Sequence, residues 1–383
     1  MRLLLATNHL GLGGSESYLL AVAEQFDRLG HEATIFAPEL GNGVEAAVER
    51  GLSVVGEADL PDECDAALVQ DAGVSFQVAY RYPEAPQLFV CHSESITLQT
   101  PPQLPGVVAK AIAMNDRVAA RLRSCAVEPE VVRMTQPIDT ERFVSRGALP
   151  EVPRRALLFS NNTPVSDHLE TLEAACREAG IELSRIGGLE GQTTDPREAL
   201  AAADIVVGYG RSILEAMACG RAAYVYDWHG GDGWVTPESY PTIESDGFAA
   251  RNGRAVLTPE ALVEDLCRYS PAMGPANHDL VVGNHRANVH AQELVQLFRE
   301  LSPGERCART NLDEMARLVR LEWRARTEVL ALGGEVMRLN ERANQAEARV
   351  AAVAEETRHS YEDTLSWRLT APLRWVSTRL RRR

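Results

Sequence analysis

The sequence contains seven cysteines, but no two of them form a Cys-x-x-Cys pair. The missing pair argues against a zinc site, because zinc-binding loops bring their thiolates close together in the sequence. An odd number of isolated cysteines also provides no disulfide framework, which is typical of a reducing compartment. We therefore expect no metal site, and a fold stabilised by its hydrophobic core alone.

Long hydrophobic runs are also absent. No segment approaches the ~18 apolar residues of a membrane span, and the N-terminal run Leu3–Ala6 is too short for a signal peptide. Basic residues are outnumbered by acidic ones, which gives a net charge of −15. This charge would repel a polyphosphate chain and disfavours nucleic-acid binding. The sequence thus predicts a cytoplasmic protein that binds no nucleic acid.

Short apolar runs alternate with helical patterns along most of the chain, and a polar, proline-containing stretch at Glu151–Arg155 divides the series in two. Such alternation predicts an α/β fold with two doubly wound, Rossmann-like domains that face a cleft. We place the first domain at residues 1–150 and the second at 151–305. Ligands of such sheets bind beyond the carboxyl ends of the strands.

After about residue 311, apolar residues recur at alternating spacings of three and four, interrupted only by Glu322. The seam consists of Met315, Leu318, Ala325, Val329, Leu332, Val336, Leu339, Ala343, Ala346, Val350 and Val353. A heptad seam of this length predicts a coiled coil over residues 306–360 and thus a homo-oligomer. The alternative is a long helix packed on its own chain.

The first candidate site is the glycine-rich turn Gly11–Gly14, which follows the apolar run Arg2–Ala6 and precedes a helical pattern. Glycines at positions such as Gly13 and Gly14 let the backbone pass close to a ligand, and the helix that follows directs its amides there. The turn is no dinucleotide fingerprint, since Glu16 occupies the position of the third glycine. A tight turn without a ligand is the alternative.

The second candidate site follows the apolar run Asp204–Val207 and begins at Gly210. Ser212 is suited to cap the next helix, and Glu215, one turn further, can accept two hydroxyl hydrogens from a ribose. Arg211 at the helix start meets the helix dipole unfavourably, and a bound phosphate would offset that cost. The alternative for Arg211 is a solvated surface charge.

A third glycine-containing stretch, His229, Gly230 and Gly231, follows the apolar run Ala222–Tyr226. Its backbone amides can bind a phosphate at the end of that strand. The carboxylates of Asp227 and Asp232 nearby are suited to sugar hydroxyls.

Together these stretches resemble the retaining glycosyltransferases of the GT-B fold, in the family-four group, over residues 1 to about 300. Five segments carry the resemblance in family order: Gly13-Gly14-Ser15-Glu16, Gly30-His31-Glu32, Met114-Asn115-Asp116-Arg117-Val118, Gln136-Pro137-Ile138-Asp139-Thr140-Glu141-Arg142-Phe143 and Leu214-Glu215-Ala216-Met217-Ala218-Cys219-Gly220. The last segment matches the second half of the family's Glu-x7-Glu motif. The resemblance implies a nucleotide-sugar donor as substrate and no separate cofactor.

The resemblance also implies roles for single residues. It assigns Glu215 to the ribose of the donor and places Gly13 and Gly14 beside the donor phosphates. It makes His92, after the apolar run 87–91, a candidate catalytic residue near the reacting sugar. A structural histidine is the alternative for His92.

Two positions depart from the family pattern. The first glutamate of the motif falls on Val207, and the stretch Asn161–His168 carries no arginine or lysine where the family grips the diphosphate. A sugar transferase that acts on a glycan or glycolipid acceptor is the leading interpretation. A catalytically inactive GT-B scaffold, which these departures motivate, and a sugar-nucleotide epimerase remain as alternatives.

The last stretch, residues 361–383, contains no acidic residue from Leu365 onward and ends in Arg379–Arg383. Its run from Ser366 to Arg374 resembles a terminal motif of bacterial polysaccharide-synthesis glycosyltransferases. Tryptophans such as Trp367 favour the lipid interface and arginines favour anionic headgroups. We therefore expect peripheral binding at the inner face of the plasma membrane; docking on the protein's own acidic surface is the alternative.

Overall fold

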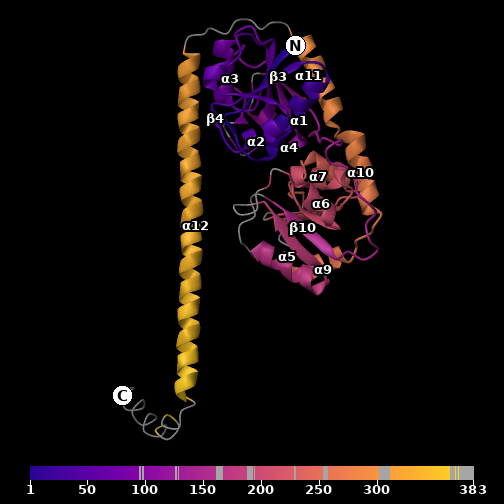
Figure 1. The fold of residues 1–383 in the computed structure, drawn as a ribbon, viewed down its shortest axis with the longest axis vertical. Coiled ribbons are helices and arrows are strands. Elements are labelled where there is room, and N and C mark those ends of the chain that lie inside the picture. Colours follow the sequence, from indigo (N-terminus) through magenta and orange to yellow (C-terminus); the bar gives the residue numbers. More distant parts are fainter. Residues whose placement is uncertain are drawn as a thin grey trace. The chain divides into compact units, whose positions relative to one another are not determined.

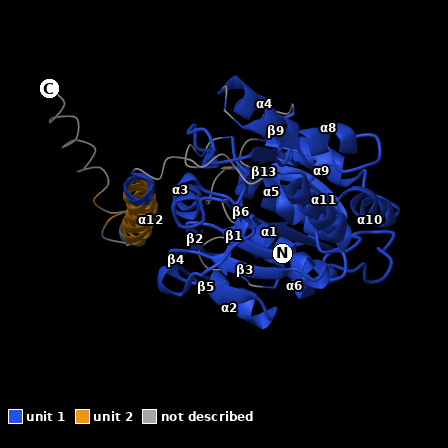
Figure 2. Cartoon of the chain, turned by 90° about the horizontal axis from the view of Figure 1, so that it is seen from above, with its two compact units in different colours: residues 1–320 blue, residues 321–383 orange. Residues whose placement is uncertain are grey.

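A computed structural model describes the chain except for residues 95, 97–98, 126, 128, 161–166, 188–192, 194, 228–229, 253–257, 302–310, 363–366, 368–369 and 371–383. The chain divides into two compact units, Met1–Arg320 and Leu321–Arg383 (Figure 2). The first unit contains both sheets and the candidate sites, and the second consists of a helix and the residues that follow it.

The first sheet of the described residues has seven strands in the order β5-β3-β1-β6-β7-β8-β9, and every pairing in it is parallel. Its strands are β1 (Arg2–Ala6), β3 (Glu32–Phe36), β5 (Ser53–Val55), β6 (Ala66–Val69), β7 (Gln87–Cys91), β8 (Lys110–Ala113) and β9 (Glu130–Arg133). Two short strands, β2 (His9–Leu10) and β4 (Glu39–Leu40), pair beside it. The central strands are apolar throughout because helices cover both faces.

Side chains alternate between the two faces of this sheet, as β1 shows. Leu3 and Leu5 pack with α1 (Gly14–Arg28), α2 (Gly43–Glu49) and α11 (Ala287–Glu300). Leu4 and Ala6 pack on the other face. The helices there are α3 (Ala72–Arg81), α4 (Asp116–Ser124) and the beginning of α12 (Leu312–Glu362), and a 3-10 turn, η1 (Glu57–Asp59), lies between β5 and β6.

The second sheet has five strands in the order β11-β10-β12-β13-β14, of which only the last pairing is antiparallel. Its strands are β10 (Arg155–Phe159), β11 (Glu182–Ile186), β12 (Ile205–Gly208), β13 (Ala222–Asp227) and β14 (Gly230–Trp234). Strand β14 was not anticipated, because its four-residue start Gly230–Gly233 contains three glycines and reads as a loop.

Helices cover both faces of the second sheet as well. The core on one face includes α5 (Asp167–Glu178) and α9 (Pro259–Leu266). The core on the other face includes α6 (Arg197–Ala202), α7 (Arg211–Ala218), α8 (Tyr240–Ser245) and α10 (Met273–Asn284). Two sheets of this kind, each enclosed by helices, form the two Rossmann-like halves that the sequence predicts.

The chain crosses between the two halves twice, and the crossings lie side by side. Ile138 forms a parallel bridge with Arg286, and its amide donates to the His285 carbonyl at 2.7 Å. The second crossing carries the chain from α10, which packs on α7, to α11, which packs on α1 (Figure 1). The range 151–305 expected for the second domain therefore includes a helix that belongs to the first core.

Helix α12 comprises 51 residues. Leu312 and Ala316 near its beginning are buried in the first core, with Met315 and Val319 packed against it. Leu318, Leu321 and the large apolar side chains from Val329 to Val353 of this helix are exposed. No helix in the described part of the chain is both long enough and apolar enough to cross a bilayer. Most residues of the predicted basic tail, 361–383, lie outside the described residues.

Candidate functional site

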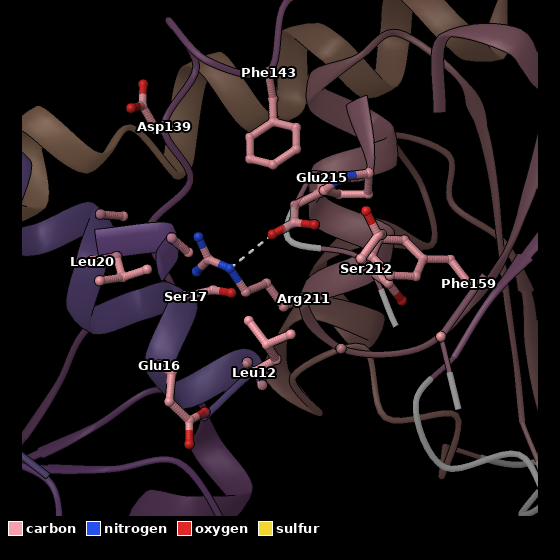
Figure 3. A pocket seen from close by; sticks show the side chains of 18 of the residues that line it. Leu12, Glu16, Ser17, Leu20, Asp139, Phe143, Phe159, Arg211, Ser212 and Glu215 are labelled. Atoms are coloured by element: carbon pink, nitrogen blue, oxygen red, sulfur yellow. Dashed lines mark hydrogen bonds and ion pairs between the residues drawn. The ribbon is translucent and has the colours of Figure 1, made fainter. Parts of the chain in front are cut away.

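A cavity of about 380 Å³ opens between the two halves of the first unit. Its walls come from the glycine-rich turn, α1, α2, the first crossing segment, and the loops at the carboxyl edge of the second sheet (Figure 3). The lining residues are Gly11, Leu12, Gly13, Gly14, Glu16, Ser17, Leu20, Ala21, Ala46, Arg50, Asp139, Arg142, Phe143, Phe159, Ser160, Gly187, Thr193, Pro196, Tyr209, Gly210, Arg211, Ser212 and Glu215. Six residues predicted to bind the donor thus line one cavity.

The glycine-rich turn and helix α7 approach each other across this cavity. A Cβ atom added at Gly14 would lie 3.9 Å from the Cβ of Arg211. Gly13 is the N-cap of α1 and has extended backbone, with no side-chain cap. The start of α1 lies in the cavity wall together with the Glu16 carboxylate, whose Oε2 would be 2.5 Å from a Cβ atom added at Gly13. An anion that binds the first amides of this helix must displace that carboxylate.

Helix α7 begins differently from the expectation. Gly210, not Ser212, is its N-cap. The backbone of Gly210 has φ 61° and ψ −132°, a conformation that residues other than glycine adopt only with strain. The Ser212 hydroxyl instead donates to the Tyr209 carbonyl at 2.8 Å. The sharp turn at Gly210 brings the backbone of Tyr209 and the start of α7 to the cavity wall.

Arg211 and Glu215 form a buried ion pair one helical turn apart. The Arg211 Nε donates to Glu215 Oε1 at 2.9 Å (Figure 3). The Arg211 Nη1 donates to the Pro137 carbonyl at 2.9 Å. Their side chains are only 7% and 8% exposed. The unfavourable position of Arg211 at the helix start is therefore offset inside the protein, and Arg211 is not a solvated surface charge.

Glu215 is buried, yet charged groups determine its electrostatic environment. Burial raises the pKa of its carboxyl group, while Arg211, Arg50 and Arg142 lower it. Arg211 contacts this carboxylate, and Arg50 and Arg142 act on it from farther away. A carboxylate so held is a fixed hydrogen-bond acceptor. The described cavity lining carries three arginines and three acidic residues, Glu16, Asp139 and Glu215.

His92 lies behind this cavity, outside its lining. Its ring meets the Tyr18 ring edge-on at 4.9 Å, and the Tyr18 hydroxyl is 3.0 Å from His290 Nε2. Burial lowers the pKa of His92 to about 3, with a smaller contribution from Arg211. The structure therefore holds His92 as a neutral ring packed in a buried aromatic cluster.

The third glycine-containing stretch is placed apart from the cavity. His229 lies outside the described residues. Gly230 and Gly231 are in strand β14 and pair with Asp227 and Tyr226, and neither glycine lines the cavity. Gly230 and Gly231 therefore belong to an edge strand and not to the expected phosphate-binding loop.

The two departures from the family pattern look different in the structure. Val207 is fully buried in the second sheet, where it belongs to the core beneath α5 and α9. Residues 161–166 lie outside the described residues. A valine at position 207 fills hydrophobic core and provides no acceptor for a sugar hydroxyl.

Sequence reasoning missed two of the cations at the site. Arg50 caps the C-terminus of α2, and Arg142 lies in the first crossing segment, within the stretch quoted for its family resemblance. No local pattern singles out Arg50, because its role depends on where α2 packs relative to the crossing. Asp139 and Phe143 line the same cavity as these two arginines and Glu215.

No family model and no curated protein matches the sequence. Among solved structures, the Anabaena protein Alr3699/HepE, in complex with UDP and glucose, is similar at a TM-score of 0.55 and 11% identity over 79% of this chain and 100% of that one. A Rickettsia africae glycosyltransferase matches at 0.51 and 14% over 78% and 98%. An alpha-glucosyltransferase in complex with UDP and DNA matches at 0.54 and 10% over 78% and 100%.

These likenesses span both halves of the first unit and confirm the predicted fold class. The chain has the GT-B arrangement, with two Rossmann-like halves facing a cleft and a helical region at the C-terminal end. At 10–14% identity they establish the fold alone.

Proposed function

We propose that the protein is a glycosyltransferase that moves a sugar from a nucleotide-sugar donor to a glycan or glycolipid acceptor. The observation that carries the proposal is the convergence of the glycine-rich turn and Glu215 on one cavity between the two halves. The similar Anabaena protein Alr3699/HepE has been solved in complex with UDP and glucose and, separately, with UDP-glucose. Each structure covers 79% of this chain. Neither the acceptor nor a role in bacterial surface polysaccharide synthesis has support beyond the sequence resemblance.

In this proposal the ribose of the donor meets Glu215 and the diphosphate lies toward Gly13 and Gly14. Breaking the glycosidic phosphate bond leaves positive charge on the sugar and negative charge on the departing diphosphate. Arg211, close to the start of α1, and the first amides of that helix are placed to stabilise the departing charge once the Glu16 carboxylate moves away. The cleft positions donor and acceptor, and a retaining outcome follows the family-four resemblance.

Nucleoside diphosphates should raise the melting temperature of the protein by a few degrees. A ligand at about 100 times its dissociation constant stabilises a folded protein by about 2.7 kcal/mol. Thermal melting with uridine, guanosine, adenosine and thymidine diphosphates measures this and identifies the base. Glu215→Ala, compared with its own ligand-free melting temperature, should lose the increase.

Glu63→Ala is the matched control for that experiment, because Glu63 is an exposed carboxylate outside the lining of this cavity. It should keep the increase. If none of the diphosphates raises the melting temperature, the donor site does not exist.

One observation favours a catalytically inactive scaffold as the second candidate. Val207 stands in the hydrophobic core where the family places its first glutamate, and the Glu215 carboxylate already has a partner in Arg211. The diphosphate experiment separates the two candidates, because a scaffold would show no base-dependent stabilisation. No contact in the structure favours the epimerase alternative.

The seam of α12 is proposed to form a coiled coil with a second copy of the chain, since its large apolar side chains are exposed. Sedimentation equilibrium should show an oligomer for the full chain and a monomer for the double variant Leu332→Glu, Val336→Glu. Leu330→Glu is the matched control, because Leu330 is exposed on the same helix but lies off the seam. A monomeric wild-type protein would contradict the coiled coil.

The basic tail is proposed to bind anionic membrane surfaces, where each arginine near the headgroups adds about 1 kcal/mol of attraction. Full-length protein should float with vesicles that contain phosphatidylglycerol, and a variant ending at Glu362 should stay in the dense fraction. Vesicles of phosphatidylcholine alone provide the control. Equal recovery of the two proteins with anionic vesicles would remove the tail from membrane binding.

A further inference from the structure

Two arginines line the cavity without a matching set of partners. Arg50 has an 11% exposed side chain, and its ion-pair partner Glu24 is 3.5 Å away. The Nε of Arg50 is buried and makes no hydrogen bond. Burial lowers the pKa of Arg50, and the next largest cause is the positive charge of Arg142. A buried guanidinium whose Nε has no acceptor has a donor left for a ligand.

Arg142 lines the same cavity and also has a buried Nε without an acceptor. Its side chain is 20% exposed, and its nearest carboxylate, that of Asp195, is 3.8 Å from Nη2. The two arginines come from α2 and from the first crossing segment, so the fold brings them together from separate elements.

Acids lie near both arginines but leave the Nε donors of both unused. Burial raises the pKa of Glu24, so its carboxylate takes up a proton more readily than an exposed one. Asp139 uses Oδ1 to accept from the amides of Glu141 and Arg142, and its buried Oδ2 has no hydrogen-bond partner. Glu215 is already paired with Arg211.

We propose that Arg50 and Arg142 bind the phosphate oxygens of an anionic ligand in this cavity. Planar guanidinium groups suit phosphate because their donors match its oxygens in pairs. A hydroxyl of the same ligand can donate to Asp139 Oδ2. The site provides the cations that the sequence does not place between residues 161 and 168, and it does so from the opposite wall of the cleft.

The phosphate has two chemical sources, the diphosphate of a nucleotide donor or the phosphate of a phosphorylated acceptor. The inference rests on the proposed function only for this choice of source. A purely structural alternative is that Arg50 balances the negative end of the α2 dipole, which would require no ligand.

Calorimetric titration with inorganic pyrophosphate and, separately, with UDP tests the proposal on the full-length protein. Arg50→Met and Arg142→Met should each weaken pyrophosphate binding about tenfold or more, the scale of one charge-assisted hydrogen bond. Arg28→Met is the matched control. Arg28 is exposed and lies outside the cavity lining, and it pairs with Glu141, which precedes Arg142 in the chain. It should leave the affinity unchanged.

The UDP titration identifies the source. Equal weakening of UDP and pyrophosphate assigns the arginines to the donor diphosphate. Unchanged UDP affinity with weakened pyrophosphate assigns them to a phosphorylated acceptor, and pyrophosphate binding without UDP binding keeps this anion site while the donor proposal fails.

Three results would overturn the anion site even where UDP binds through Glu215: no pyrophosphate binding to the wild type, unchanged affinity in both methionine variants, or equal weakening by Arg28→Met. If a methionine variant does not fold, Arg50→Lys and Arg142→Lys replace it. These keep the charge but lose the paired donors, and they should bind pyrophosphate severalfold more weakly than the wild type.

Discussion

Replacing Arg211 by methionine should lower the free energy of unfolding by about 3 kcal/mol, the largest effect expected of a single substitution at the site. The variant would leave the buried Glu215 carboxylate without its hydrogen-bonded partner and the Pro137 carbonyl without a donor. We expect the lower end of the usual range of about 3–5 kcal/mol for a broken buried pair, because Arg50 and Arg142 still attract the carboxylate.

Urea unfolding followed by tryptophan fluorescence measures this loss. The double variant Arg211→Met, Glu215→Met should recover most of it, since two apolar side chains can replace a buried pair at little cost. Arg317→Met breaks an exposed intrahelical pair with Glu314 and should change the stability by less than about 0.5 kcal/mol. If the single and double Arg211 variants are equally destabilised, the ion pair is not what holds the start of α7.

Acidification from pH 7 to pH 5 should destabilise the protein by about 3 kcal/mol. His285 and His290 are buried, and burial lowers their pKa values to about 4 and about 3. Because the unfolded chain takes up protons near pH 6.5 and the folded one does not, their contribution is complete above pH 6.5 and is lost as the pH falls toward 4. At pH 5 each has lost about 2 kcal/mol.

Buried carboxyl groups act in the opposite direction. Burial raises the pKa of Asp71 to about 6, so between pH 6 and pH 4 the folded state holds a proton that the unfolded state releases. That restores about 1 kcal/mol at pH 5, and the loss from the histidines remains larger. Burial also lowers the pKa of His92, which adds to the loss. It raises the pKa values of Glu24, Glu215 and Asp232, which offsets part of the loss.

Urea unfolding at pH 5, 6, 7 and 8 checks the sign and the size of this effect. His290→Gln keeps a polar partner for the Tyr18 hydroxyl and should reduce the loss between pH 7 and pH 5 by about 2 kcal/mol. His359→Gln, on the exposed face of α12, should leave it unchanged. A stability that is flat from pH 8 to pH 5 would mean that these histidines are not buried as described.

The sequence predicted the fold class because alternating apolar runs and helical patterns are local signals. The family resemblance assigned Gly13, Gly14 and Glu215 to one donor site, and these residues, which follow strands of two different sheets, line one cavity. Strand β14 escaped prediction because its pairing with β13 depends on the neighbouring strand and not on its own glycine-rich sequence.

The electrostatics of the site depended on tertiary contacts that no local pattern reveals. Arg211 was expected to need a phosphate, but Glu215 and the Pro137 carbonyl already engage it. The less well-partnered cations are Arg50 and Arg142, which α2 and the first crossing segment bring to the cavity from separate parts of the chain. The sequence predicts an anionic ligand, but no local pattern in it singles out Arg50 or Arg142 as cavity residues.

A crystal structure with a bound nucleotide sugar, chosen by the diphosphate that most raises the melting temperature, tests the central proposal most directly. The ribose hydroxyls should lie within hydrogen-bonding distance of the Glu215 carboxylate, with the diphosphate between the glycine-rich turn and the cavity arginines. A nucleotide bound elsewhere, with Glu215 in contact only with Arg211 and the cleft empty, would contradict it.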